Sequence, residues 1–195
     1  TVKRTWESGT GREKICTDLH YTFESGGKIQ VRMDTSVPEG YPCLPRIGTE
    51  LQVPKEFCEV NWYGRGKTET YPDRKMSVPI GAYREQVDEQ ECPYLVPGEW
   101  GGHEDTEWME LRDQAGCGIR IQAETPFHFD AHRNSIREYE QAAHWHELPE
   151  GDRIWLHIDG IFAGLGGDTG WFQTIHPEYQ IGAGEYTMSY RMEPV

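Results

Sequence analysis

The amino-acid sequence predicts an all-β fold, an antiparallel sandwich that carries a single short helix. Three observations support this prediction. Apolar residues recur at every second position, glycine and proline interrupt the chain at short intervals, and only one segment combines helical spacing with a capping motif. With 195 residues the chain is long enough to bury its own core, and we expect residues 1–195 to form one domain.

Alternation is clearest in three stretches, residues 28–33, 153–159 and 186–192. In each stretch apolar side chains point to one side of an extended chain and mostly polar side chains to the other, which is typical of antiparallel strands with one buried face. The apolar members are Ile29, Val31, Met33, Ile154, Leu156, Ile158, Tyr186, Met188, Tyr190 and Met192. Shorter pieces of the same pattern are Tyr21 with Phe23, Ile119 with Ile121, and Phe127 with Phe129.

Glycine- and proline-rich turns separate these strands. Glycine accepts backbone angles that other residues avoid, and proline fixes its own φ, so clusters of the two favour tight turns. The clusters are Ser25–Gly27, Pro38–Gly40, Pro97–Gly98, Gly101–Gly102, Pro149–Gly151 and Gly182–Gly184. Many short strands with such punctuation indicate a sandwich or a barrel.

One segment departs from this pattern. Ser135 and Glu138 have the spacing of a capping box, in which each side chain bonds the other residue's backbone N–H. Tyr139 follows at helical spacing, and we predict a short helix from about Ile136 to about His144.

Charge and cysteine content restrict the function. The net charge of −14 disfavours nucleic acid and anionic lipid as partners, whereas a neutral ligand such as a sugar meets no such penalty. Solubility alone also explains such a charge. The five cysteines are odd in number and lack a C-x-x-C spacing, so we expect reduced thiols and a cytoplasmic setting. Cys43 and Cys58 remain a possible pair in an oxidising compartment.

The start of the chain is polar and charged. Residues 1–13 contain no apolar run that resembles a signal peptide or a membrane span. Because the first residue is not methionine, we expect the chain to begin inside a longer polypeptide.

The segment Gly164–Trp171 is the strongest candidate for a binding element. Four glycines in seven residues contribute little to packing, so the segment is predicted to be a tight loop that exposes Trp171. The Trp171 ring can stack on the apolar face of a sugar. A buried core ring beside a structural turn is the alternative. Asp168 is a possible sugar ligand, although an Asp beside glycines more often stabilises a turn.

A second polar and aromatic cluster allows two interpretations. It is either part of a sugar cleft or a hydrogen-bonded scaffold with salt bridges. Its members are Asn61, Trp62, Glu69, Tyr71, Asp73 and Arg74.

Two histidine pairs have spacings that suit metal ligands, His128 with His132 and His144 with His146. No carboxylate or cysteine cluster with ligand spacing accompanies them, so we predict no metal site. Although the chain has 33 acidic residues, no recognisable glycosidase acid or nucleophile motif occurs, and we assign no catalytic residue.

Three groups of motifs, in this order along the chain, resemble the C-terminal domain of the large β-galactosidases of glycoside hydrolase family two. The resemblance covers roughly Lys28 to Tyr190. The motifs are Pro45–Gly48 with Val60–Gly66 and Glu69–Arg74, then Trp155–Gly160, then Gly164–Trp171 running into Gly184–Tyr186.

The resemblance implies a supersandwich of the galactose-mutarotase-like type, here truncated, as the last of five domains. Catalysis would belong to a central barrel that is absent here and supplies two glutamates, and other domains would bind magnesium and sodium, with no cofactor in this part. The resemblance also implies that Trp171 reaches the active site near the aglycone of a substrate such as lactose. Expected partners are the rest of the parent chain, the galactoside and further copies of the enzyme.

Two other functions remain open from the sequence. One is a free-standing carbohydrate-binding module, and the other is a mutarotase-like enzyme, which needs a general acid and a general base across a cleft. No spacing in the sequence selects such a pair, and likeness of fold alone is weak support for an activity.

Overall fold

A computed structural model describes residues 1–6, 14–92, 94–98, 100–168, 171 and 174–195. Within these residues β-strands dominate the regular secondary structure, as predicted. The strands are β1 Val2–Trp6, β2 Ile15–Phe23, β3 Ile29–Val37, β4 Arg46–Pro54, β5 Glu59–Arg65, β6 Ile80–Gln86, β7 His103–Arg112, β8 Gly118–His132, β9 Arg153–Phe162 and β10 Gly184–Pro194. The helical segments are α1 Ile136–Gln141 and four single 3₁₀ turns, η1 Ser25–Gly27, η2 Val87–Glu89, η3 Trp145–Glu147 and η4 Pro177–Tyr179.

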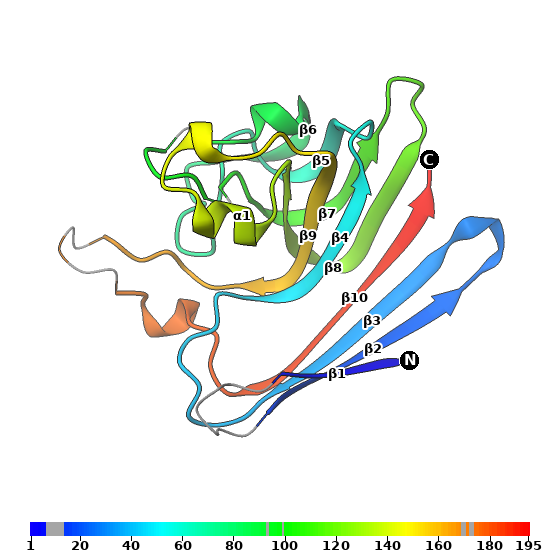
Figure 1. Cartoon of the computed structure of the whole chain (residues 1–195). Coiled ribbons are helices and arrows are strands. Elements are labelled where there is room, and N and C mark those ends of the chain that lie inside the picture. The colour runs from blue at the N-terminus through cyan, green and yellow to red at the C-terminus, as the bar shows by residue number, and fades with distance from the viewer. Residues whose placement is uncertain (7–13, 93, 99, 169–170, 172–173) are drawn as a thin grey trace.

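The strands pair antiparallel in the order β1-β2-β3-β10-β8-β7-β5-β6, with β9 added to β8 and β4 added to β9. The long strand β8 pairs with β10 through residues 119–123 and with β9 through residues 128–132. Because β8 changes partner along its length, the sheet divides into two layers, β1-β2-β3-β10 below and β4-β9-β8 above (Figure 1). The all-β sandwich prediction is confirmed.

The core lies where the apolar faces of the two layers meet. Val31 and Tyr190 of the lower layer and Ile158 of the upper layer are almost completely buried. The core continues under β5 and β7, where the Trp62 ring centroid lies 5.9 Å from that of Phe129. Burial of these large side chains removes their apolar surface from water and stabilises the layered arrangement.

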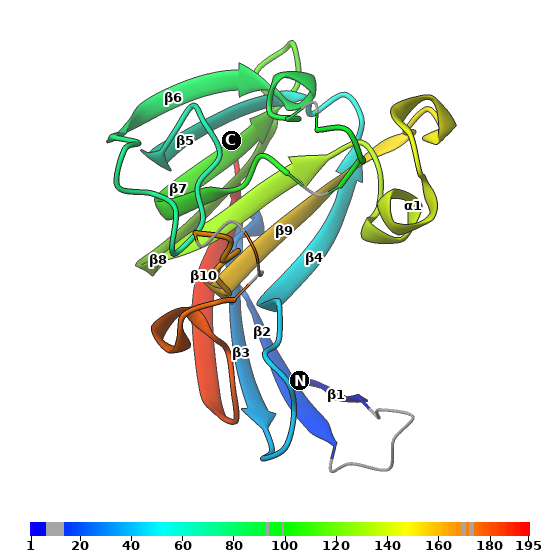
Figure 2. The same ribbon diagram turned by 90° about the vertical axis from the view of Figure 1, so that its left-hand side faces the viewer.

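The predicted alternation is confirmed for one face of β9, where Ile154, Leu156 and Ile158 are buried. The other face differs from the expectation, because His157 and Asp159 are buried as well. The segments between the strands, including α1, lie over that face (Figure 2), so both sides of β9 are shielded from water.

The helix prediction is correct in its start and too long at its end. The capping box forms, since the Ser135 side chain accepts from the Glu138 backbone N–H and the Glu138 carboxylate accepts from the Ser135 N–H. The helix stops at Gln141, and Ala142 is extended. Directly after this end the Ala143 N–H donates to the Glu147 carboxylate rather than to a carbonyl of the helix, so the helical hydrogen-bond pattern does not continue.

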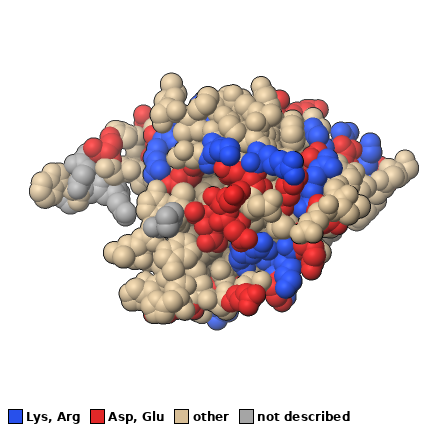
Figure 3. Space-filling model, turned by 90° about the horizontal axis from the view of Figure 1, so that it is seen from above, with Lys and Arg blue, Asp and Glu red and all other residues tan. Residues whose placement is uncertain are grey.

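The surface carries charges of both signs. Acidic and basic side chains lie side by side on the face seen from above (Figure 3), so the net charge is not gathered into one patch there. No helix in the described part of the chain is long and apolar enough to cross a membrane. All five cysteines are described and unpaired, and Cys43 and Cys58 form no disulfide in this structure.

Candidate functional site

The glycine-rich loop begins where β9 ends and is tied to its neighbours at its base. The Ala163 N–H donates to the Pro45 carbonyl at 2.9 Å, and the Gly164 N–H donates to the Tyr179 carbonyl at 2.9 Å. The loop therefore leaves the upper layer from a fixed point. Thr169 and Gly170, two residues of the predicted motif, lie outside the described residues.

Asp73 holds the first turn of this loop. Its Oδ1 accepts from the Leu165 N–H at 3.0 Å, and its Oδ2 accepts from the Gly166 N–H at 2.7 Å. A Cβ atom on Gly164 would lie 2.5 Å from Asp73 Oδ2, so only glycine allows this approach. Gly166 has a φ of +68°, which also favours glycine. The carboxylate thus fixes the loop backbone through two charge-assisted hydrogen bonds.

Glu69 in turn holds the segment that carries Asp73. Its buried carboxylate accepts from the Tyr71 hydroxyl at 3.0 Å, from Arg74 at 2.7 Å and from the Gly101 N–H at 3.1 Å. Burial raises the pKa of Glu69, but the hydrogen bonds from Tyr94, Gly101 and Tyr71 outweigh burial and lower the pKa overall. Glu69 therefore remains ionised and anchors the turn at residues 71–74, whose two end residues bond each other's backbone.

These contacts decide between the two interpretations of the polar and aromatic cluster. Trp62 is fully buried, and its indole N–H donates to the Arg65 carbonyl, while Asn61 donates to Glu59 within strand β5. Most of the cluster is a hydrogen-bonded scaffold, with Tyr71 also lining the apolar pocket beside the loop, and Asp73 is the member that bonds the glycine loop.

Trp171 projects from the loop with 88% of its surface exposed. The exposure predicted from the glycines is confirmed, and the alternative of a buried core ring is wrong for this structure. Asp168 pairs with His176, with Oδ2 and Nε2 2.9 Å apart, and this hydrogen bond raises the pKa of His176. Both side chains are exposed, so Asp168 links the two flanks of the loop, which is the turn-stabilising role favoured by the sequence.

An apolar pocket of about 550 Å³ adjoins the loop. Leu165 and Ile175, which precede and follow Trp171 in the chain, both line it. The remaining lining residues include Cys43, Leu44, Pro45, Tyr71, Val96, Pro97, Trp100 and Phe162. The loop thus carries an exposed indole, and the residues at its two ends border an apolar recess; both are surfaces on which the C–H faces of a sugar or an aglycone can pack.

A buried charged network lies behind this region, on the polar face of β8, β9 and β4. Arg46 bonds both Asp130, at 2.6 Å, and Asp159, while His157 Nδ1 lies 2.5 Å from Asp130. Burial raises the pKa of Asp130, yet the charges of Arg46 and His157 hold it well below its usual range. His157 Nε2 reaches the partly exposed Glu50 at 3.2 Å.

The structure brings members of both histidine pairs together with carboxylates. His128 lies with Asp130 and Asp159, and His144 and His146 lie with Glu147, with the possible ligand atoms of each group within 4.8 Å of one another. His128 bonds Glu104 at 2.8 Å and stacks on Phe162, and its ring lies near Asp130 and Asp159. The Arg46 guanidinium already contacts both carboxylates, so a metal ion there would face a fixed positive charge. His144 and His146 stack on each other at the surface, and His144 bonds Glu147.

Sequence reasoning missed both Asp73 as the loop clamp and the Arg46 network. The motif at residues 71–74 was visible, but its partner is more than 90 residues away in the chain. Nothing in the alternation of β9 indicated that its polar face is covered.

Comparisons with known proteins agree on one group. The family model described as "Beta galactosidase small chain" matches residues 2–192. A β-galactosidase of Vibrio cholerae is 34% identical over 165 residues, which are 85% of this chain and 15% of that protein. The corresponding values for the β-galactosidase of Streptococcus thermophilus are 31% over 187 residues, 95% and 18%. A Bifidobacterium adolescentis protein named β-galactosidase BgaC is 33% identical over 172 residues, with 87% and 15% covered. The chain thus spans less than a fifth of each relative's length.

Proposed function

The chain belongs to the β-galactosidase small-chain family, and we propose that it is the non-catalytic C-terminal part of a β-galactosidase that hydrolyses terminal β-galactosides such as lactose. The relatives support this proposal, because each is named a β-galactosidase and is five to seven times longer than the part matched here. Hydrolysis with retention uses two carboxyl groups on either side of the glycosidic bond. We assign both to the remainder of the enzyme.

The contribution of this chain is to complete the substrate pocket with Trp171. One observation carries this role: the start of the loop is held in place while its tryptophan is exposed. Asp73 accepts hydrogen bonds from two backbone N–H groups of the loop, and Trp171 is 88% exposed. A ring held out by an anchored loop loses little conformational entropy when a ligand packs on it. Stacking then favours a sugar or aglycone by about 0.5–1.5 kcal/mol beyond the area buried.

Assembly follows from the same proposal. The partners are the catalytic barrel and other domains of the enzyme, and further copies of it. Magnesium and sodium would be bound by those other domains. In support of this assignment, the buried Asp130 and Asp159 are both paired with Arg46, whose positive charge disfavours a cation beside them.

Activity measurements test the proposal. The purified 195-residue chain should not hydrolyse a chromogenic β-galactoside, whereas an enzyme in which this chain is joined to a β-galactosidase barrel should. Turnover by the chain alone that is lost on mutating one of its own carboxylates would contradict the non-catalytic role. An equally active enzyme without this segment would contradict its part in the pocket.

A further inference from the structure

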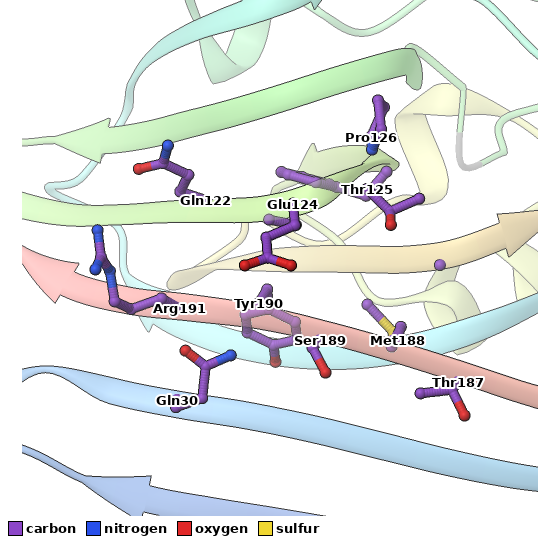
Figure 4. A pocket seen from close by; sticks show the side chains of 13 residues that line it. Gln30, Gln122, Glu124, Thr125, Pro126, Thr187, Met188, Ser189, Tyr190 and Arg191 are labelled. Atoms are coloured by element: carbon purple, nitrogen blue, oxygen red, sulfur yellow. The ribbon is translucent and has the colours of Figure 1, made fainter.

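A groove opens where strands β8 and β10 separate. The two strands pair only through residues 119–123 of β8 and 190–194 of β10. Beyond this point β8 continues towards β9, while β10 stays with β3. The groove between them has a volume of about 710 Å³ and is lined by residues of β3, β8, β9 and β10 (Figure 4).

The backbone keeps this groove open. Pro126 sits at the point of separation and has no N–H to donate to a neighbouring strand. Gly160 of β9 lies against Met188 of β10, where a Cβ atom would come within 2.7 Å of the Met188 Cβ. The two layers therefore cross at a fixed distance, and the groove is part of the fold rather than a gap in the packing of side chains.

Polar side chains converge on the groove with unused hydrogen-bonding capacity. Gln122 and Glu124 extend from β8, and Gln30, Ser189 and Arg191 extend from β3 and β10 (Figure 4). Within the described residues, five of the lining side chains make no hydrogen bond or ion pair: Gln30, Gln122, Glu124, Thr125 and Ser189. The Nε of Arg191 is buried and has no partner in that same part of the chain.

The neighbouring part of the same sheet face is different. Arg32 bonds Asp34 twice, and Asp34 also accepts from the Thr187 hydroxyl at 2.7 Å. These groups satisfy one another. The groove, in contrast, gathers polar side chains that have no protein partner, so a ligand bound there would replace water and would leave the Asp34–Thr187 contact in place.

The chemistry of the lining selects the ligand. The side-chain amides of Gln30 and Gln122 and the hydroxyls of Thr125 and Ser189 can each donate and accept hydrogen bonds. Glu124 only accepts, and Arg191 only donates. A neutral molecule with several hydroxyl groups matches this mixture, since each hydroxyl also donates and accepts. An anion would face Glu124 and the −14 net charge of the chain, and an apolar ligand would leave the polar groups unpaired. Ala123, Phe127 and Met188 supply apolar floor for C–H groups.

We propose that this groove is a second carbohydrate-binding site that takes a neutral di- or oligosaccharide. None of its lining residues belongs to the Trp171 loop, and the proposal does not rest on the role of Trp171. The groove volume lies within the range of about 300–1,000 Å³ that is usual for small-ligand sites.

The test is a titration of the 195-residue chain with lactose and with a neutral galacto-oligosaccharide, followed by calorimetry and by backbone amide NMR. We expect shift changes at residues 122–126 and 187–191. Gln122→Ala and Glu124→Ala should each weaken binding by about three- to tenfold, as the loss of one hydrogen bond does. Glu107→Ala removes an exposed carboxylate of β7 outside the groove and is the matched control for Glu124→Ala.

Trp171→Ala separates this site from the loop. Affinity for the groove should be unchanged in that variant, whereas loss of all sugar binding in Trp171→Ala would overturn the proposal. Absence of any shift change with saturating sugar would also overturn it, as would equal binding of an anionic saccharide. Because Gln122 and Glu124 are exposed, their variants should melt like the parent chain, which makes a loss of binding interpretable.

Discussion

The upper layer and the β1-β2 ribbon of the lower layer are both antiparallel, but they differ in how completely they are covered. On β9 both faces are buried, with Ile158 on one side and Asp159 on the other. On β2 the inward-facing row begins with buried residues such as Leu19 and ends with Tyr21 and Phe23, which are 40% and 75% exposed. The ribbon therefore extends beyond the layer that it packs against.

The free edge of the upper layer explains this difference. Within the described residues β4 pairs only with β9, so its other edge has unpaired backbone groups. A groove of about 560 Å³ separates β4 from the inner face of β1, β2 and β3. The upper layer is covered on both faces of β9 and carries the Trp171 loop, but its β4 edge is open. Together with the exposed apolar surface of the ribbon, this edge is what another strand or domain would cover.

The largest expected effect breaks the covered layer. Arg46→Ala leaves Asp130 and Asp159 buried without their cation, and we expect a loss of about 3–5 kcal/mol in the free energy of unfolding. Urea denaturation measures the change. The control is Arg153→Ala, whose pair with Asp152 is exposed to water and should contribute far less to stability. Equal effects of the two variants would show that the buried network does not hold the layer together.

The free energy of unfolding, measured as a function of pH, tests the same buried network. Asp130 raises the pKa of His157, so the stabilisation from protonated His157 is present below the unfolded pKa of about 6.5 and is lost as pH rises through the folded pKa. Burial lowers the pKa of His103 to about 3, which has the opposite sign and costs stability as pH falls below about 6.5.

Together the two histidines predict a stability maximum near about pH 6.5. His157→Gln should flatten the alkaline side and leave the acidic side. The exposed His176 adds to the alkaline side through its bond with Asp168, so His176→Gln is the control that isolates His157. An unchanged alkaline slope in His157→Gln would contradict a protonated His157 in the folded state.

The fold was largely predictable because its strands follow local rules, as at Ile154, Leu156 and Ile158. The capping box at Ser135 was equally local, but helical spacing did not indicate that α1 ends where the Ala143 N–H bonds the Glu147 carboxylate. Exposure of Trp171 could be inferred from its glycines. The clamp by Asp73 and the burial of His157 and Asp159 could not, because both depend on which segments fold over the polar face of the upper layer.

A smaller effect concerns the ribbon. We expect the isolated chain to dimerise or aggregate through the β1-β2 surface and the free edge of β4. Replacing the exposed Phe23 by Ser should weaken this association measurably, while Met76→Ser, at a loop position that is even more exposed, should not. Sedimentation over a range of concentrations measures the change. A monomer at high concentration would indicate that the ribbon needs no partner.

The most direct test of the account concerns Trp171 in an intact β-galactosidase that contains this chain. Trp171→Ala should weaken substrate binding by about three- to tenfold or more, because one stacking contact is lost, while the melting temperature stays close to that of the parent enzyme. Trp171→Phe should retain part of the binding. One substrate titration and one thermal melt on each variant are sufficient. A large fall in melting temperature with unchanged kinetics in the folded enzyme would contradict the proposed role of Trp171 in the substrate pocket.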